Sequence, residues 1–246
     1  MQNYSNFQKI KSLIHTKDPF ENIQDILQPY KTQIFSVPAM IDWIVNLINT
    51  HKPELFIEVG SWTGFSSEKI ALSLMEIGNP NSGLICVDTW LGAHEFWTTK
   101  NSEEGWWKKD LKVEGNHFRE NHYQFLSLKN GFPSVYYNFL SNMYHVGVHE
   151  KICPFPQTSA IASRWLKNNN VKSDIIYIDA SHEYDDVVAD LNNYWPLLNE
   201  NGIMFGDDYW ISDVRNAVNE FVSEKKIHLE FHLETNGLPI FWLLRK

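Results

Sequence analysis

Five short apolar runs recur along the chain, and four of them are followed directly by glycine or an acidic residue. Runs of this kind, without alternation of apolar and polar positions, are typical of strands covered on both faces in a parallel sheet. Between the last two runs, apolar residues recur at helical spacing, which predicts a crossover helix over about 185–198. The pattern therefore predicts an α/β protein with strands at 55–59, 84–87, 151–155, 175–178 and 203–205.

The flanking segments add helices and a hairpin to this pattern. Ser36 near an N-cap and Pro38 in a first turn predict a helix over 36–50, with one apolar face. Ser212 is expected to cap another helix. After it, residues 227–233 alternate, Asn236-Gly237 supplies a tight turn, and 240–244 forms a last strand, which predicts an antiparallel hairpin. Residues 1–35 are weakly patterned and are expected to form one or two loosely attached helices.

Charge and composition narrow the possible partners. The chain of 246 residues carries 21 Lys plus Arg against 30 Asp plus Glu, so its net charge is -9. A surface of that sign repels phosphate backbones, which argues against nucleic acid. The N-terminal residues lack the layout of a signal peptide, and no apolar run approaches the roughly 20 residues that span a bilayer. We therefore expect a cytoplasmic protein with no membrane partner, in which Cys86 and Cys153 are buried free thiols.

Chemistry-bearing residues cluster where the predicted strands end. Glu58, Gly60 and Gly64 follow the first strand, and Asp88 ends the second, where an acid can accept hydrogen bonds from ribose hydroxyls. A glycine turn before a helix lets a ligand approach the backbone, and the helix N-terminus favours an anionic group.

A second group of acids follows the fourth and fifth strands. Asp179, Asp207 and Asp208 are expected to converge in the crevice beyond the sheet, with His182 beside them. Three carboxylates would repel one another there, and a hard divalent cation such as Mg²⁺ or Ca²⁺ would relieve this repulsion. The alternative is that Asp207 or Asp208 only caps the following helix.

These features resemble the class I S-adenosylmethionine-dependent methyltransferases. Glu58-x-Gly60-x-x-x-Gly64 with Asp88 looks like their cofactor site, and IDASHEY and GDDYW resemble segments of the metal-dependent O-methyltransferases. The types concerned act on catechol, caffeoyl-CoA, antibiotic sugars and cephalosporin precursors. The likeness covers roughly residues 36–90 and 145–244, and it implies a Rossmann-like fold with a mostly parallel seven-stranded sheet and a C-terminal antiparallel hairpin.

The resemblance also implies site residues. Glu58 would lie near the methionine amino group of S-adenosylmethionine, Ser66 near its carboxylate and Ser159 near its adenine. A divalent cation, with Mg²⁺ expected and Ca²⁺ or Mn²⁺ as alternatives, would be held by Asp179, Asp207 and Asp208, where the family usually has asparagine at the last position. The implied cofactor-binding residues are Glu58, Gly60, Ser61, Trp62, Gly64, Ser66, Asp88, Thr89, Ser159 and Asp179.

His182 stands where the catechol-type enzymes carry a lysine that takes the proton of the acceptor. Histidine can do the same near neutral pH, so His182 and Asp179 are the predicted catalytic residues. The alternative is that His182 caps the following helix or only orients an acid.

The segment between the two matched blocks departs from the compact catechol-type pattern. It is rich in aromatic residues, and we expect a helical insertion over 91–144 that serves as a lid, as a subunit interface, or as a small subdomain packing its own rings. The prediction is thus one methyltransferase domain over 1–246, with an N-terminal extension over 1–35.

The predicted function is metal-dependent methyl transfer to a hydroxyl of a small-molecule acceptor, a sugar or secondary metabolite, by a homo-oligomer. N-methylation, or action on a phosphorylated or amidated sugar, stays open. A non-catalytic binding protein on the same fold is a further alternative, because fold does not fix function. A nicotinamide oxidoreductase would need a glycine fingerprint that this chain lacks.

Overall fold

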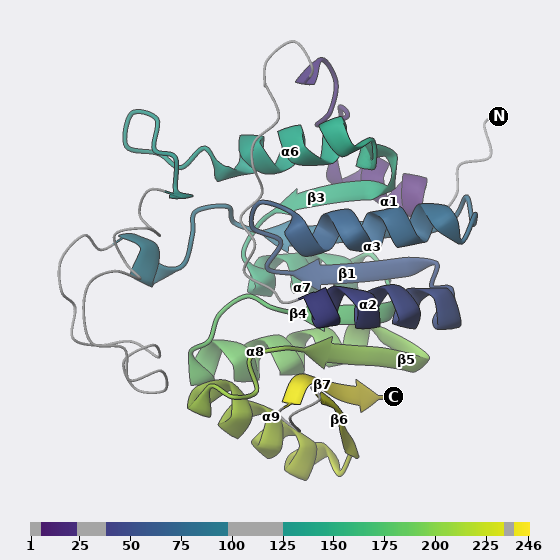
Figure 1. Cartoon of the computed structure of the whole chain (residues 1–246), viewed down its shortest axis with the longest axis vertical. Helices are drawn as coiled ribbons and strands as arrows, with labels where there is room; N and C mark the ends of the chain where they lie inside the picture. The colour runs from purple at the N-terminus through teal and green to yellow at the C-terminus, as the bar shows by residue number, and fades with distance from the viewer. Residues whose placement is uncertain (1–5, 24–37, 98–124, 234–238) are drawn as a thin grey trace.

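The computed structural model describes residues 6–23, 38–97, 125–233 and 239–246. Its centre is a seven-stranded sheet of order β3-β2-β1-β4-β5-β7-β6 (Figure 1). Neighbouring strands from β3 to β5 pair in parallel, and β7 is antiparallel to both β5 and β6. The predicted Rossmann-like α/β fold is confirmed. The strands are β1 (Leu55–Val59), β2 (Gly83–Asp88), β3 (Ile152–Pro156), β4 (Ser173–Ile178), β5 (Leu198–Gly206), β6 (Leu229–Leu233) and β7 (Pro239–Arg245).

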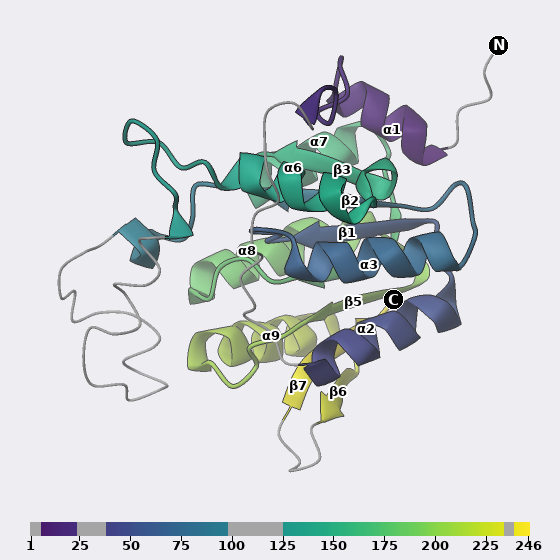
Figure 2. The ribbon, with the colours of Figure 1, turned by 45° about the horizontal axis from the view of Figure 1, so that its top comes forward.

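Helices cover both faces of the sheet (Figure 2). On one face, α1, α7, α8 and α9 share a core with alternate strand residues, and on the other face α2, α3 and α6 do so. The helices are α1 (Asn6–Ile14), α2 (Pro38–His51), α3 (Phe65–Glu76), α6 (Val135–Val146), α7 (Ser159–Asn168), α8 (Tyr184–Tyr194) and α9 (Ser212–Lys225), with short 3₁₀ turns η2 (His94–Trp97), η3 (His149–Lys151) and η4 (Trp195–Leu197). None of the described helices is both long and apolar enough to cross a membrane.

Strand β1 shows why the apolar runs do not alternate. Ile57 and Val59 pack into the core on the face of α7 and α8, whereas Phe56 packs on the face of α2 and α3. All five residues of the strand are buried. Both sets of side chains must therefore be apolar, except where the strand carries Glu58.

Two predicted boundaries are wrong around η4. Helix α8 ends at Tyr194, earlier than predicted, because Pro196 cannot continue an α-helix and the chain enters η4 instead. The dipeptide Asn201-Gly202 is typical of a turn and would begin the strand at 203, but the structure places both residues inside β5. Asn201 has φ 64° there, and the pairing of β4 with β5 shifts register between Ser173 and Ile175. The dipeptide thus belongs to an irregularity in a longer strand.

The N-terminal segment is attached more firmly than predicted. Phe7 and Ile10 of α1 are buried in the core beside the sheet. A Cβ on Gly83, the first residue of β2, would lie 2.2 Å from the ring of Phe7, so the helix rests directly on that strand. The imidazole of His15 also bonds to the carbonyl of Pro154 in β3. The expectation of a loose helix is therefore wrong for residues 6–15.

The predicted insertion over 91–144 is described only at its two ends. Its C-terminal part is α6, whose residues Phe139 and Met143 are fully buried in the core beside α3. These residues belong to the body of the domain. Residues 98–124 lie outside the described part of the chain, so the lid, the interface and the division into domains stay predictions.

Several smaller expectations can be compared directly. The antiparallel hairpin of β6 and β7 is confirmed, although its turn at Asn236-Gly237 lies outside the described residues, as does Ser36. Cys86 and Cys153 are buried free thiols, as predicted. Ser212 is the first residue of α9 and Ile211 occupies the N-cap, so the predicted capping position was wrong by one residue.

Asp190 of α8 is a buried acid outside the expected site. It is 3% exposed, and its Oδ1 has no hydrogen-bond partner. Burial raises the pKa of Asp190 to about 6; a hydrogen bond from Ser159 opposes this rise and the charge of Asp186 adds to it. Because the folded pKa lies above that of an unfolded chain, the ionised carboxylate destabilises the fold as pH rises through 6.

We therefore expect Asp190→Asn to raise the free energy of unfolding at pH 7.5 by about 1–3 kcal/mol. Below about pH 4 both states of the wild-type protein bind the proton, so the gain should disappear there. Urea unfolding at the two pH values measures this difference, with Asp42→Asn on the exposed side of α2 as the control. Equal stability of variant and wild type at pH 7.5 would contradict the prediction.

Candidate active site

A cavity of about 700 Å³ opens beyond the carboxyl ends of β1, β2, β4 and β5. This is the position where ligands bind in open parallel sheets, and the volume falls within the range of small-molecule sites. Most of the predicted site residues meet there. Those that line the cavity are Gly60, Ser61, Trp62, Ser66, Asp88, Thr89, Asp179, His182, Asp207 and Asp208, whereas Glu58, Gly64 and Ser159 do not.

The turn after β1 is built on backbone contact with β4. Gly60 has φ 98°, and a Cβ there would lie 1.9 Å from the carbonyl oxygen of Asp179. Asp179 also donates its backbone N–H to the carbonyl of Val59 over 2.8 Å. Only glycine allows this approach, so Gly60 joins the two strand ends as well as facing the cavity.

Asp88 fixes the same turn from the end of β2. Its Oδ2 accepts a hydrogen bond from the backbone N–H of Trp62 over 2.8 Å, and its Oδ1 accepts one from the N–H of Trp90 over 2.7 Å. The indole of Trp90 in turn donates to the carbonyl of Trp62 over 2.6 Å. Burial raises the pKa of Asp88, and backbone hydrogen bonds from Trp62, Trp90, Ser61 and Thr89 oppose this rise, so the carboxylate holds the turn at the wall of the cavity.

Glu58 is not a wall of the cavity, contrary to the simplest interpretation of the motif. Its side chain is fully buried, and its Oε2 accepts hydrogen bonds from the hydroxyls of Ser61, over 2.7 Å, and Ser67. Burial raises the pKa of Glu58, and hydrogen bonds from Ser66, Ser67 and Ser61 oppose this rise. Through these contacts, Glu58 connects the loop after β1 to the first helical turn of α3.

Gly64 serves packing at the start of α3. It is the N-cap residue with φ 92°, and a Cβ there would lie 2.5 Å from the Cε of Met143 in α6. No side chain caps this helix end. Phe65 and Ser66, its first two residues, line the cavity, so an uncapped helix N-terminus with its partial positive charge meets the site.

Ser159 is not among the residues that line the cavity, and its place near a bound adenine stays a prediction. Its hydroxyl bonds to Asp190 of α8, and its carbonyl accepts the hydroxyl of Tyr194 over 3.0 Å. Thr158 caps α7 by accepting the N–H of Ile161. The polar segment after β3 therefore ties α7 to α8.

The acids after β4 and β5 do converge. Tyr177, the last but one residue of β4, donates its hydroxyl to Asp179 over 2.9 Å and lies 3.3 Å from Oδ2 of Asp207. Burial, together with repulsion between the carboxylates, raises the pKa of both Asp179 and Asp207. Two negative charges in this position are unfavourable unless a proton or a cation is shared between them.

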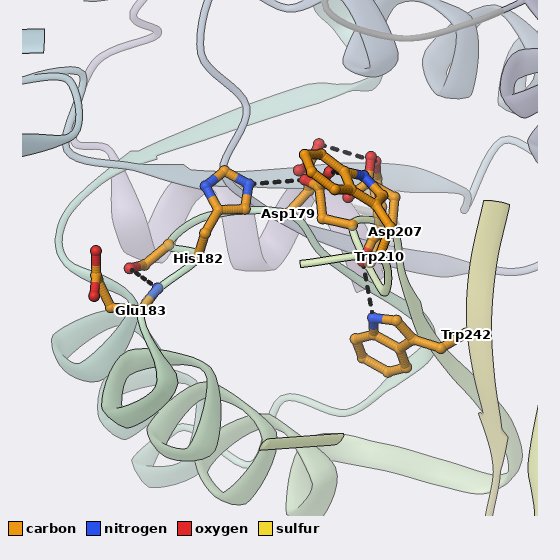
Figure 3. Close-up of polar contacts among 9 residues, drawn as sticks. Asp179, His182, Glu183, Asp207, Trp210 and Trp242 are labelled. Atoms are coloured by element: carbon orange, nitrogen blue, oxygen red, sulfur yellow. Dashed lines mark hydrogen bonds and ion pairs between the residues drawn. The ribbon is translucent and has the colours of Figure 1, made fainter. Parts of the chain in front are cut away.

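Asp208 meets His182 on the other side of this cluster. The Nε2 of His182 lies 2.8 Å from Oδ2 of Asp208, whose Oδ1 accepts the indole N–H of Trp210 over 3.0 Å. One ligand atom each from Asp179, His182 and Asp208 lies within 4.8 Å of the others. Figure 3 shows His182 directed toward the side of the cluster where Asp179 and Asp207 lie.

This donor set fits a divalent cation. Carboxylate oxygens are the preferred ligands of Mg²⁺, Ca²⁺ and Mn²⁺, and a cation would relieve the repulsion that raises the pKa of Asp179 and Asp207. Ligand atoms of Asp179, His182 and Asp208 lie within 4.8 Å of one another, and Asp207 adjoins this set through its direct contact with Asp179.

Sequence reasoning missed several residues that shape the site. Tyr177 precedes Asp179 by two positions, so both side chains lie on the same face of the strand, and this spacing could have identified it. In the sequence, nothing beyond their aromatic character marks Trp90, Phe96 and Trp210 as site residues. Their contacts with Trp62 and Asp208 join segments that are distant in sequence.

Comparison with known proteins identifies the family. The model of a family described as "Methyltransferase domain" matches residues 57–209, which include the turn after β1 and both groups of acids. The chain belongs to this family of methyltransferase domains.

Solved structures of O-methyltransferases share the fold. One is the O-methyltransferase from Bacillus cereus in complex with SAH, at 12% identity and a TM-score of 0.54, over 100% of this chain and 99% of that one. Another is TomG from Streptomyces achromogenes, involved in tomaymycin synthesis and solved with SAM, at 12% identity and a TM-score of 0.56, over 99% and 92% of the two chains.

Among curated proteins, an uncharacterised protein of Acanthamoeba polyphaga mimivirus is 38% identical over 55 residues. That match covers 21% of this chain and 25% of the length of the relative.

Proposed function

We propose that this protein transfers the methyl group of S-adenosylmethionine to a hydroxyl oxygen of a small molecule, with a divalent cation bound beside the acceptor. The observation that carries the proposal is the convergence, in one cavity, of the glycine turn with Asp88 and of the cluster of Asp179, His182, Asp207 and Asp208. The first group has the chemistry to hold a nucleoside, and the second has the chemistry to hold a metal and move a proton. Family membership and the shared fold support this assignment.

The cofactor end of the cavity has the groups that S-adenosylmethionine requires. Asp88, which lines the cavity at the end of β2, would accept hydrogen bonds from the ribose hydroxyls. The uncapped N-terminus of α3 with Ser66 would receive the methionine carboxylate. Glu58 would support the site indirectly, by holding the side chain of Ser61 in the turn after β1.

At the acceptor end, Asp179, Asp207 and Asp208 would hold the metal. A bound divalent cation lowers the pKa of an acceptor hydroxyl and fixes its oxygen for attack on the methyl carbon. If the Nε2–H of His182 donates to Asp208 across their 2.8 Å contact, Nδ1 is the ring nitrogen that would take the hydroxyl proton, with Asp208 stabilising the charged ring. The buried hydroxyl of Tyr177 would keep Asp179 and Asp207 at a fixed separation.

Titration calorimetry and mass spectrometry test the proposal together. S-adenosylmethionine and its demethylated product should each bind with one site per chain, whereas NAD should not bind, because the turn has no dinucleotide fingerprint. With Mg²⁺ present, a panel of sugars and other hydroxylated small molecules should yield a product heavier by one methyl group. Absence of cofactor binding by a protein with a native circular-dichroism spectrum would refute the proposal.

A further inference from the structure

The acceptor end of the cavity is acidic beyond the predicted metal ligands. Among the described residues that line the cavity, six are carboxylates, two are histidines, and none is lysine or arginine. Glu183 and Asp186 stand at the start of α8 and do not belong to the cluster of Asp179, His182 and Asp208. The six carboxylates are Asp88, Asp179, Glu183, Asp186, Asp207 and Asp208.

Acids at a helix start often serve the helix itself, and the two residues differ in this respect. Asp186 accepts the hydroxyl of Ser181 over 2.7 Å and sits in the first turn of α8, so its charge also stabilises the helix end. Glu183 is the N-cap residue, yet its side chain makes no capping hydrogen bond. Glu183 lines the cavity, and no capping hydrogen bond engages its carboxylate.

The ion-pair contact between Glu183 and His94, across the cavity, is long and partly exposed to solvent. His94 of η2 places its Nε2 4.0 Å from Oε1 of Glu183, and both side chains are partly exposed, at 65% and 43%. Figure 3 shows Glu183 on the far side of His182 from Asp207. The negative charge of Glu183 therefore lies apart from the cluster of Asp179, His182 and Asp208. A ligand group between η2 and α8 would meet this carboxylate.

Aromatic side chains surround the same region. Trp62 and Phe96 meet edge to face at 5.1 Å, and both line the cavity together with the half-exposed Trp210. Aromatic faces combined with carboxylates suit an ammonium group, because ring quadrupoles and negative charges both attract cations. The same set of charges repels carboxylates and phosphates.

We infer that the acceptor carries a protonated amine, and that Glu183 selects it over neutral and anionic analogues. This inference rests on the proposed function and specifies its substrate class as a hydroxylated amine, such as an amino sugar. Phosphorylated acceptors and coenzyme A esters are disfavoured by the same charges. Even with a divalent cation held by the acid cluster, Glu183 and Asp186 keep their charges for the acceptor.

The nitrophenyl glycosides of glucosamine, N-acetylglucosamine and glucuronate provide a test, because they share a sugar ring and differ in charge. Calorimetry would measure their binding to the protein saturated with Mg²⁺ and demethylated cofactor, and mass spectrometry would measure methyl transfer. We expect the cationic glycoside to exceed the anionic one by about 10-fold in affinity and in kcat/KM, with the neutral one between them.

Variants at residue 183 separate charge from shape. Glu183→Gln should reduce the ratio between the cationic and anionic glycosides to about 2-fold, and Glu183→Lys should invert it. Glu224→Gln, on the exposed part of α9 and away from the cavity, should leave the ratio unchanged. The absent capping bond means that helix α8 should persist in both variants, which circular dichroism would verify.

The outcomes distinguish this inference from the function on which it rests. Methylation with an equal or opposite charge preference, or a ratio that Glu183→Gln does not change, overturns the inference and leaves the function standing. If S-adenosylmethionine binds but no glycoside binds or is methylated, the amino-sugar class is wrong. If S-adenosylmethionine itself does not bind, the proposed function fails first.

Discussion

Asp207→Ala is expected to weaken Mg²⁺ binding by more than about 100-fold and to reduce methyl transfer to a similar extent at limiting metal. Loss of an outer hydrogen-bond partner alone typically weakens a metal site by about 10- to 100-fold, so loss of a direct ligand should exceed that. Binding of S-adenosylmethionine should stay within about 2-fold of wild type, because Asp88 and the turn after β1 are untouched.

Three matched variants make this prediction specific. Tyr177→Phe removes only the hydroxyl that bonds to Asp179 and approaches Asp207, so we expect a loss of about 10- to 100-fold in metal affinity. Asp208→Asn places at this position the amide that is usual in the metal-dependent O-methyltransferases that the segment resembles, and should have the smallest effect of the three site variants. Asp42→Asn, on the exposed side of α2, should have none.

Thermal unfolding gives a second measure that does not depend on catalysis. Mg²⁺ should raise the Tm of the wild-type protein, because a ligand that binds only the folded state stabilises it, and should not raise that of Asp207→Ala. A wild-type protein that is fully active in excess chelator, with a Tm that does not respond to Mg²⁺, would remove the metal from the proposal. Asp207 and Asp208 would then have only structural roles.

The parts of the fold that follow local rules could be predicted from the sequence. The apolar run of β1 and its exit at Gly60 could be identified because a buried parallel strand needs continuous apolar residues and the turn needs a left-handed residue. The convergence of Asp179 and Asp207 followed from a geometric rule, since both stand after the carboxyl ends of neighbouring parallel strands.

The parts that depend on contacts between distant segments could not be predicted. Glu58 resembles a ligand contact in the motif, but Ser67 draws it into the interior. Ser159 stands at a suitable turn, but a bond to Asp190 of α8 takes its hydroxyl. Asn201 has a typical turn sequence, yet β4 pairs with the residues on both sides of it. In each case a partner outside the local pattern changed the role that the pattern indicated.

His182 is the residue for which sequence and structure leave two distinct roles, and a pair of variants separates them. As the proton acceptor, His182 would contribute about 10² to 10⁴ in turnover. As a positioning residue, it would act through the 2.8 Å contact between its Nε2 and Asp208. Gln can donate a hydrogen bond to Asp208 but cannot take a proton near neutral pH, whereas Ala can do neither.

We expect His182→Gln and His182→Ala to lose turnover equally, by about 10² to 10⁴, because both lack a proton acceptor. Affinities for S-adenosylmethionine and Mg²⁺, measured by calorimetry, should remain within a few-fold of wild type in His182→Gln, since the contact with Asp208 persists. His228→Gln, an exposed histidine between α9 and β6, serves as the control and should keep full turnover. Near-wild-type turnover of His182→Gln, with a loss of metal affinity confined to His182→Ala, would instead assign His182 to holding Asp208 and would require another proton acceptor.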